Sequence, residues 1–508
     1  MRVRRLLMGG VLVVLTLGLV VWWQFDELRG MPQLDKDEKE EEGKGAVRLK
    51  PKLQPAGFTV VPLILNNTSS VFSKSQLLEL CNTGSGLQIT HAWAKGAGLP
   101  NANWNNYKPN KSDKLEKSNT DYTGDGPQYY KAGEFLGRCF PVEIASSQAG
   151  RSMGHCADYI NYILHADARL STEFGWSVFV RKAQMCPNST YLHGEYPNKH
   201  LLDENVRNVW MPNLEQISHQ QMHYFAKMHT ILCKTRATCV AINKFLDTGL
   251  NGTDLHRPQT IFMSHSSPDT LLDVPPAIVL SQKRDFNAFI HTFGSSGRKS
   301  SFAVFDCWEM HPEWPTLILI GNTRPVQFRM RHWSAELKAK GEPRHFKFPK
   351  NVRVINDRLD VAHLRALQYQ SAVHICPSEQ EGYGHYINEA RSLGSVVLTT
   401  AYPPMNEFVQ DGKSGILINH RDPYPEKYQG MSPYFISPVK VDHLQICEAV
   451  EKVMAMSIDE RMQMGRLARL AYEYDTALME KNLENFRREA NFRLFGDDWE
   501  NERKRLFV

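Results

Sequence analysis

The second half of the chain alternates short apolar runs with segments whose apolar residues recur at helical spacing. The apolar runs are nearly continuous, so they lack the alternation of a strand that faces water on one side. Such runs between helices predict a parallel sheet that is covered on both faces. We expect strands at residues 289–293, 316–320, 352–355, 373–376 and 395–399. We expect helices at residues 300–310, 361–372 and 388–393.

The first half shows the same alternation less regularly. Strands are expected at residues 178–180, 209–211, 231–233 and 261–263, and helices at 216–228 and 238–246. Residues 96–127 are rich in Asn, Lys, Gly and Asp, which predicts a surface insertion. Residues 269–284, with two prolines, fit a crossover between the halves. The simplest architecture is two α/β domains with a cleft between them, in which ligands bind at the carboxyl ends of the strands.

The first 56 residues follow another pattern. Residues 6–23 carry no charge and follow three arginines, which predicts a membrane anchor with residues 1–5 in the cytosol. At 1.5 Å per residue this run spans about 27 Å, enough for a thin bilayer. A cleaved signal peptide also fits, but the run is long for one and lacks a small-residue cleavage site. Residues 24–56 are charged and low in complexity, which predicts an acidic stem.

Composition narrows the class of protein. Hydrophobic residues make up 42% of the chain, enough for a buried core, and the net charge of +5 gives no reason to expect nucleic-acid binding. The nine cysteines include no Cys-x-x-Cys pair, which argues against zinc and thioredoxin-type sites, and their odd number leaves at least one thiol outside any intrachain disulfide. Five Asn-x-Ser/Thr sequons are compatible with a lumenal, single-pass type II protein of the Golgi or endoplasmic reticulum membrane. They begin at Asn66, Asn67, Asn110, Asn188 and Asn251.

Residues 376–390 combine a strand end, a glycine-rich turn and the start of a helix. Gly382 and Gly384 let backbone amides approach a ligand, and free amides at a helix start favour a diphosphate. Ionised carboxylates such as Glu381 and Glu389 suit the paired hydroxyls of a sugar or a ribose. A strand–glycine–helix turn is common by itself, and glutamates at this spacing are usually solvated. The specificity therefore comes from the whole string.

This string resembles the Glu-x7-Glu signature of glycosyltransferase family 4, whose retaining enzymes have the GT-B fold of two Rossmann-like domains. The resemblance extends from about residue 289 to 418. It implies that Glu381 contacts the donor sugar, that Glu389 holds the ribose, and that the amides of residues 383–385 face the diphosphate. The family pattern matches at Pro377, Ser378, Glu381, Gly382, Tyr383, Gly384, Glu389 and Ala390, with His385 after the second glycine.

The same family carries a basic site after the first strand of this domain, where residues 293–300 stand here. The resemblance implies that Lys299 neutralises the leaving diphosphate, with Gly294 and Arg298 beside it in the donor site. Ser295 stands where the family usually has arginine, and Arg298 is the candidate to replace it. An Arg-Lys pair is usually a solvated surface feature, but its place after a strand favours binding.

Retaining transfer requires a stabilised leaving nucleotide. Lys299, Arg298 and the helix start at Gly384 can supply positive potential, so we expect neither a metal nor another cofactor. The Asp-x-Asp site of the other common transferase fold occurs here only as Asp35 and Asp37, within the predicted stem. The sequence therefore predicts metal-independent activity.

The acceptor side is expected at the strand ends of the first half. Asn213 and Glu215 follow one expected strand, Lys234 follows the next, and His265 follows the last as a third catalytic candidate beside Glu381 and Lys299. A helix cap, a surface pair and an ordinary loop histidine are the alternatives for Asn213, Lys234 and His265. Their place at carboxyl strand ends is the only reason to choose them.

The sequence thus predicts an acceptor-side domain at residues 57–270, a nucleotide-sugar-binding domain at 285–456 and a helical segment at 457–508. That segment either crosses back onto the first domain, as in GT-B proteins, or is a solvated charged helix. The predicted activity is sugar transfer from a nucleotide sugar to a glycan, protein or lipid acceptor. The alternatives are an inactive GT-B scaffold that binds glycans or partners, and a GT-B epimerase or phosphorylase.

Overall fold

The computed structural model describes residues 141–145, 158–159, 161–162, 165–170, 188–197, 201–203, 206–217, 219–249, 256–281, 283–294, 296–321, 349–355, 359–421, 435 and 437–501. All of them belong to the larger of two units, Asn67–Val508. The predicted anchor, stem, insertion and first strand, at residues 6–23, 24–56, 96–127 and 178–180, lie outside the described residues. Within the described part of the chain, no helix is both long and apolar enough to cross a membrane.

The first half forms a sheet of parallel strands in the order β2-β1-β3-β4-β5-β6. The strands β4, β5 and β6 confirm the predicted strands at 209–211, 231–233 and 261–263. The strands β1 to β3 were not predicted, because each is short and carries polar side chains such as Glu143. The bounds are β1 Val142–Ile144, β2 Ala168–Leu170, β3 Thr190–His193, β4 Arg207–Trp210, β5 Thr230–Cys233 and β6 Gln259–Phe262.

Helical segments pack on this sheet, and their apolar side chains form a shared hydrophobic cluster with it. The helix α6 (Arg236–Gly249) confirms the prediction at 238–246 and packs Phe245 against Phe225. The helix predicted at 216–228 is wrong in type, since two 3₁₀ segments, η4 (Leu214–Gln216) and η5 (His219–Lys227), stand there instead. The extended backbone of Ile217 ends η4 after one turn while its buried side chain still joins the core.

The second half forms another sheet of parallel strands, in the order β12-β11-β10-β7-β8-β9. All five strands predicted here are confirmed, and β12 is added at the edge. The central strand β10 is buried along its whole length, as its continuous apolar run predicted. The bounds are β7 Asp285–Gly294, β8 Leu317–Gly321, β9 Val352–Ile355, β10 Ser371–Cys376, β11 Val396–Thr400 and β12 Ile416–Ile418.

The helices of the second half follow the predicted order with shifted ends. The helix α10 ends at Gln370 because Ser371 already begins β10, and α11 begins at His385, three residues earlier than predicted. The predicted crossover at 269–284 contains η6 (Thr270–Asp273) and α7 (Pro276–Leu280). The other bounds are α8 Ser301–Met310, α10 Val361–Gln370, α11 His385–Ser392, η7 Met405–Phe408, α12 His443–Met454 and η9 Gly496–Asp498.

Two disulfides tie neighbouring elements together. The disulfide Cys233–Cys239 joins the end of β5 to α6, and Cys307–Cys447 joins α8 to α12. Cys376, at the end of β10, is a buried free thiol, in line with the odd cysteine count.

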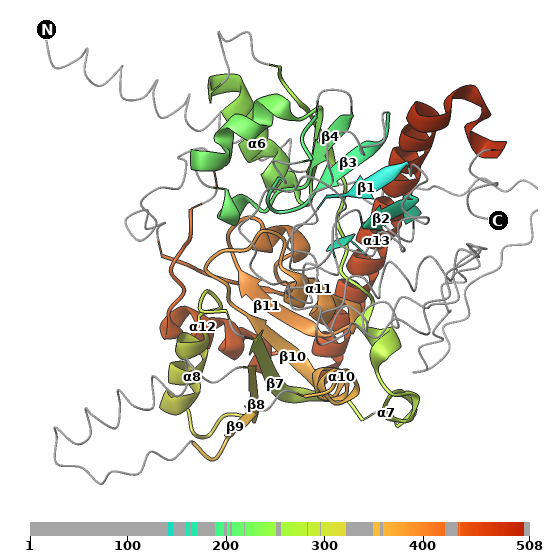
Figure 1. The fold of residues 1–508 in the computed structure, drawn as a ribbon. Coiled ribbons are helices and arrows are strands. Elements are labelled where there is room, and N and C mark those ends of the chain that lie inside the picture. Colours follow the sequence, from blue (N-terminus) through green and yellow to red (C-terminus); the bar gives the residue numbers. More distant parts are fainter. Residues whose placement is uncertain are drawn as a thin grey trace, which may run out of the picture. The chain divides into compact units, whose positions relative to one another are not determined.

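The helix α13 (Ile458–Phe495) contacts both sheets. It begins at a capping box between Ser457 and Glu460, and Gly465 packs closely against Gly394 of the second half. Further along, Asn491 Nδ2 donates to Asp167 Oδ2 beside β2 at 2.9 Å. Figure 1 shows α13 in red, running from the second sheet past α11 to β1 and β2. The C-terminal helix therefore crosses back onto the first half and is not a solvated helix.

Candidate donor and acceptor site

The loop between β10 and α11 presents the helix start that the sequence predicted. Gly384 precedes α11 with φ +94°, a left-handed conformation that glycine adopts without strain. A helix start leaves its first amides without helical partners, and the helix dipole adds positive potential there. The backbone of residues 383–385 is therefore arranged to receive an anion.

Glu381 and Lys299 form an ion pair beside this helix start. Lys299 Nζ lies 3.0 Å from Glu381 Oε1 and 3.1 Å from the centre of the Tyr386 ring. Ser378 Oγ donates to the same Glu381 oxygen at 2.5 Å. Burial raises the pKa of Glu381, but Lys299 and Ser378 outweigh it and hold the pKa below its usual value. The structure thus brings an ionised carboxylate and an ammonium group from two different loops together.

Glu389 is held by an arginine that sequence reasoning missed. Arg365 Nη1 and Nη2, on α10, donate to the two Glu389 oxygens at 2.8 Å and 3.3 Å. Burial raises the pKa of Glu389, but Arg365 outweighs it and holds the pKa below its usual value. In the sequence, Arg365 is only an arginine within a predicted helix, and nothing there links it to Glu389.

Asp158 is a second missed residue, and it connects the two halves. Its Oδ2 accepts from Lys234 Nζ at 2.6 Å, while its Oδ1 lies 2.7 Å from His265 Nε2 and 3.0 Å from His385 Nε2. Burial raises the pKa of Asp158, but these partners, Lys234 first, hold it well below its usual value. An ionised carboxylate only accepts hydrogen bonds, so both histidines donate from Nε2. Burial lowers the pKa of His265 to about 4, so its ring is neutral at pH 7.

Within the described residues, Asp158, His265 and His385 form a group that could in principle hold a metal ion. The Lys234 ammonium on the same carboxylate opposes a second cation there. A ligating imidazole nitrogen must also be unprotonated, whereas both Nε2 atoms donate to Asp158. These contacts fit a hydrogen-bonded network better than a metal site.

The acceptor-side candidates lie directly against the donor loop. A Cβ added to Gly382 would come within 2.4 Å of Glu215 Oε2 and 2.8 Å of Asn213 Oδ1, so this loop approaches the first half only because residue 382 is glycine. Lys234 Nζ donates to Asn213 Oδ1 at 2.7 Å. The alternatives for two of these residues are wrong, since Asn213 makes no side-chain cap and Lys234 is buried. His265 is buried in the loop after β6.

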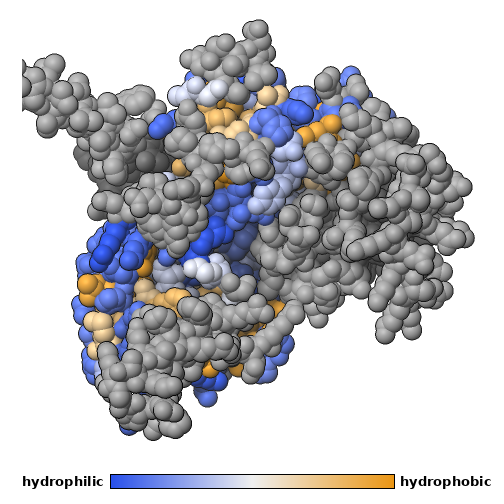
Figure 2. Space-filling view, turned by 60° about the vertical axis from the view of Figure 1, so that its left-hand side comes forward, coloured by the Kyte–Doolittle hydropathy of each residue, from blue (hydrophilic) through white to orange (hydrophobic). Residues whose placement is uncertain are grey.

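The basic segment after β7 completes the site. Gly294 has φ +58° and is exposed, and Arg298 N and O take part in hydrogen bonds with Ser296 and Glu379. The Arg298 guanidinium opposes the rise that burial causes in the pKa of Glu215, and it adds to the lowering of the pKa of Glu381, so it lies within electrostatic range of both halves. Figure 2 shows hydrophilic residues gathered in the middle of the described surface. Residue 295, where the family usually has arginine, lies outside the described residues.

Residues 310–428 match the sequence model of a family described as Glycosyl transferases group 1. This segment is therefore similar to glycosyltransferases. The matched residues include all of Glu381 to Glu389, whereas Lys299 precedes them in the sequence. A search of curated proteins finds no match to the chain.

Several solved structures resemble the chain at low identity. The pneumococcal O-GlcNAc transferase GtfA with UDP and GlcNAc is 16% identical, with a TM-score of 0.42 over 62% of this chain and 59% of its own. A UDP-forming trehalose-phosphate synthase from Burkholderia vietnamiensis is 13% identical, with a TM-score of 0.40 over 60% of this chain and 71% of its own. Sucrose-phosphate synthase from Thermosynechococcus elongatus is 14% identical, with a TM-score of 0.42 over 59% and 73%. The chain spans 59% of the length of the first structures that it matches.

Proposed function

We propose that this protein is a retaining GT-B glycosyltransferase that moves a sugar from a nucleotide-sugar donor to a hydroxyl-bearing acceptor. One observation carries the proposal: the Lys299–Glu381 ion pair lies beside the start of α11. Glu381 and α11 lie within the segment that matches a glycosyltransferase family, and Lys299 precedes that segment. The helix start and Lys299 would bind the diphosphate, and Glu381 the donor sugar. Glu389, which resembles the family's ribose ligand, keeps its carboxylate ionised against Arg365.

A donor screen tests this function directly. We expect the full chain to release nucleotide from at least one of UDP-glucose, UDP-N-acetylglucosamine and GDP-mannose. Glu389→Ala and Lys299→Ala should both strongly reduce the release, because each removes a group that would hold the donor. Nucleotide release can be followed in a coupled assay. Binding of a nucleotide sugar without release would favour the alternative of an inactive binding module, and no binding at all would contradict both functions.

We also propose that the transfer needs no metal ion. Lys299, Arg298 and the amides at the start of α11 supply positive charge where the leaving diphosphate would gain negative charge. Nucleotide release should therefore stay within about twofold when EDTA is added, since no metal acts as the Lewis acid. A loss of activity that Mg²⁺ or Mn²⁺ restores would contradict this prediction.

We further propose that the catalytic part lies in the lumen of the Golgi or endoplasmic reticulum, behind the anchor predicted at residues 6–23. The disulfides Cys233–Cys239 and Cys307–Cys447 support this location, because disulfides persist in the secretory pathway and are rare in the cytosol.

A further inference from the structure

Glu215 brings a carboxyl group from the first half to the donor loop. It lies in η4, directly after β4, where the carboxyl end of the strand directs the chain toward the second half. Its Oε2 is buried, and among the described residues no group donates a hydrogen bond to it. Buried polar atoms nearly always have partners, so an unpartnered carboxylate oxygen at this place points to a role with a ligand.

The same oxygen lies against the turn that would hold the donor sugar. The distance of 2.4 Å to a Cβ built on Gly382 shows that nothing separates Glu215 from the residue that follows Glu381. An acceptor hydroxyl that approaches this turn from the first half would therefore come close to Glu215. Asn213 lies beside it and accepts from Lys234 Nζ, while Glu215 Oε2 keeps its capacity to accept a proton.

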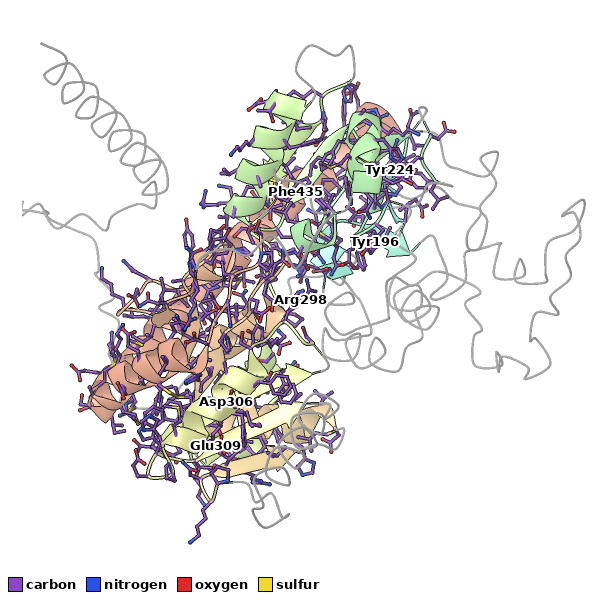
Figure 3. The ribbon with its side chains drawn as sticks, turned by 90° about the vertical axis from the view of Figure 1, so that its left-hand side faces the viewer. Tyr196, Tyr224, Arg298, Asp306, Glu309 and Phe435 are labelled. Atoms are coloured by element: carbon purple, nitrogen blue, oxygen red, sulfur yellow. A yellow bond between two sulfur atoms is a disulfide. The ribbon has the colours of Figure 1, made fainter. Side chains whose placement is uncertain are left out.

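The charged and titratable groups around Glu215 come from several elements. Arg298 follows β7, Glu381 follows β10, Lys234 follows β5, and Tyr196 follows β3. Figure 3 labels Arg298 and Tyr196 on facing parts of the two halves. Burial raises the pKa of Glu215 to about 7; Glu381 adds to this rise, and Arg298 and Lys234 oppose it. A carboxyl group with such a pKa can both accept and release a proton near neutral pH.

We propose that Glu215 is a catalytic residue that accepts the proton of the attacking hydroxyl. The acceptor oxygen forms a bond to C1 of the donor sugar on the face from which the diphosphate departs, as retention requires, and the bond between C1 and the diphosphate oxygen breaks with its electron pair left on the diphosphate. The hydroxyl proton moves to the Glu215 carboxylate and is later released to water. This role rests on the proposed transfer function and assigns one of its steps to the first half of the chain.

The test uses water as the acceptor and the donor, among UDP-glucose, UDP-N-acetylglucosamine and GDP-mannose, that the wild-type chain hydrolyses fastest. Glu215→Gln keeps the shape of the side chain but cannot accept the proton, so hydrolysis at pH 8 should fall about 10²-fold. Donor affinity should stay unchanged. The wild-type rate should rise with pH around a midpoint near 7, because the ionised form is active, and this step should vanish in the variant.

The matched control is Glu448→Gln, an exposed glutamate on α12 that pairs with Lys452. Glu215→Ala with added formate should regain part of its rate, which a purely structural role would not allow. Glu215→Asp keeps a carboxylate, so its hydrolysis rate should still rise with pH. If the other variants misfold, this pH dependence tests the role of the carboxylate. Hydrolysis by Glu215→Gln within threefold of wild type, or an unchanged pH step, would overturn this role alone. A wild-type chain that binds no nucleotide sugar would instead refute the proposed function.

Discussion

Replacing Lys299 with alanine should lower the rate of sugar transfer about 10²–10³-fold, the usual cost of removing one group that stabilises developing negative charge. Lys299 contacts Glu381 and the Tyr386 ring, so it is fixed beside the start of α11 before any ligand binds. Its ammonium group would meet the diphosphate as the bond to the sugar breaks. The rate constant for nucleotide release under saturating donor measures this loss.

A matched control separates this effect from a general loss of charge. Lys413 is exposed in the loop before β12, and Lys413→Ala removes the same charge from the same half of the chain. It should leave the rate unchanged. Lys299→Arg should recover part of the activity, because the charge is kept while its geometry changes. A Lys299→Ala variant with more than a tenth of wild-type activity would exclude the lysine from charge stabilisation.

The second large effect concerns stability. Arg365→Ala should lower the free energy of unfolding by about 3 kcal/mol, because it leaves Glu389 with an unpaired charge in a largely buried place. The Arg365 side chain is 3% exposed and that of Glu389 19%, so water compensates only a little. Denaturation in guanidinium chloride, followed by circular dichroism, measures the change.

Two further variants sharpen this stability test. Arg466→Ala, on an exposed arginine of α13 that binds Gln463, should cost less than about 1 kcal/mol. Combining Arg365→Met with Glu389→Leu should recover most of the stability, since apolar pairs often replace buried ion pairs without loss. If Arg365→Ala unfolds at the wild-type denaturant concentration, the pair contributes nothing to the fold.

The sequence predicted the second sheet well because its strands are rich in apolar residues. Such strands leave continuous apolar runs, and β7 to β11 were all found from them. The strands β1 and β2 are three residues long and include Glu143 and Arg169, so no run marks them. Strand detection therefore depended on apolar side chains along the strand and not on burial, since β1 is wholly buried and was missed.

The sequence predicted those parts of the site that neighbouring residues form. It did not predict contacts between residues that are far apart in the sequence. The loop of Gly382 and Gly384 and the start of α11 follow from neighbouring residues. The contact between Asp158 and His385 joins residues 227 positions apart, and no periodicity encodes it. Arg365 was likewise hidden, because a buried arginine and a solvated one look alike in a helical pattern.

The helix α13 restricts how the two halves of the chain can move relative to each other. It is one continuous helix of 38 residues without proline, fixed by Arg461 to the backbone of Phe286 at one end and by Asn491 to Asp167 toward the other. Helices bend sharply only at features such as proline, glycine or a bulge, and the glycine of α13, Gly465, is already packed against Gly394. Any separation of the two halves must therefore flex this helix or detach its far end. We therefore expect α13 to favour the arrangement of the two halves seen here and to resist their separation.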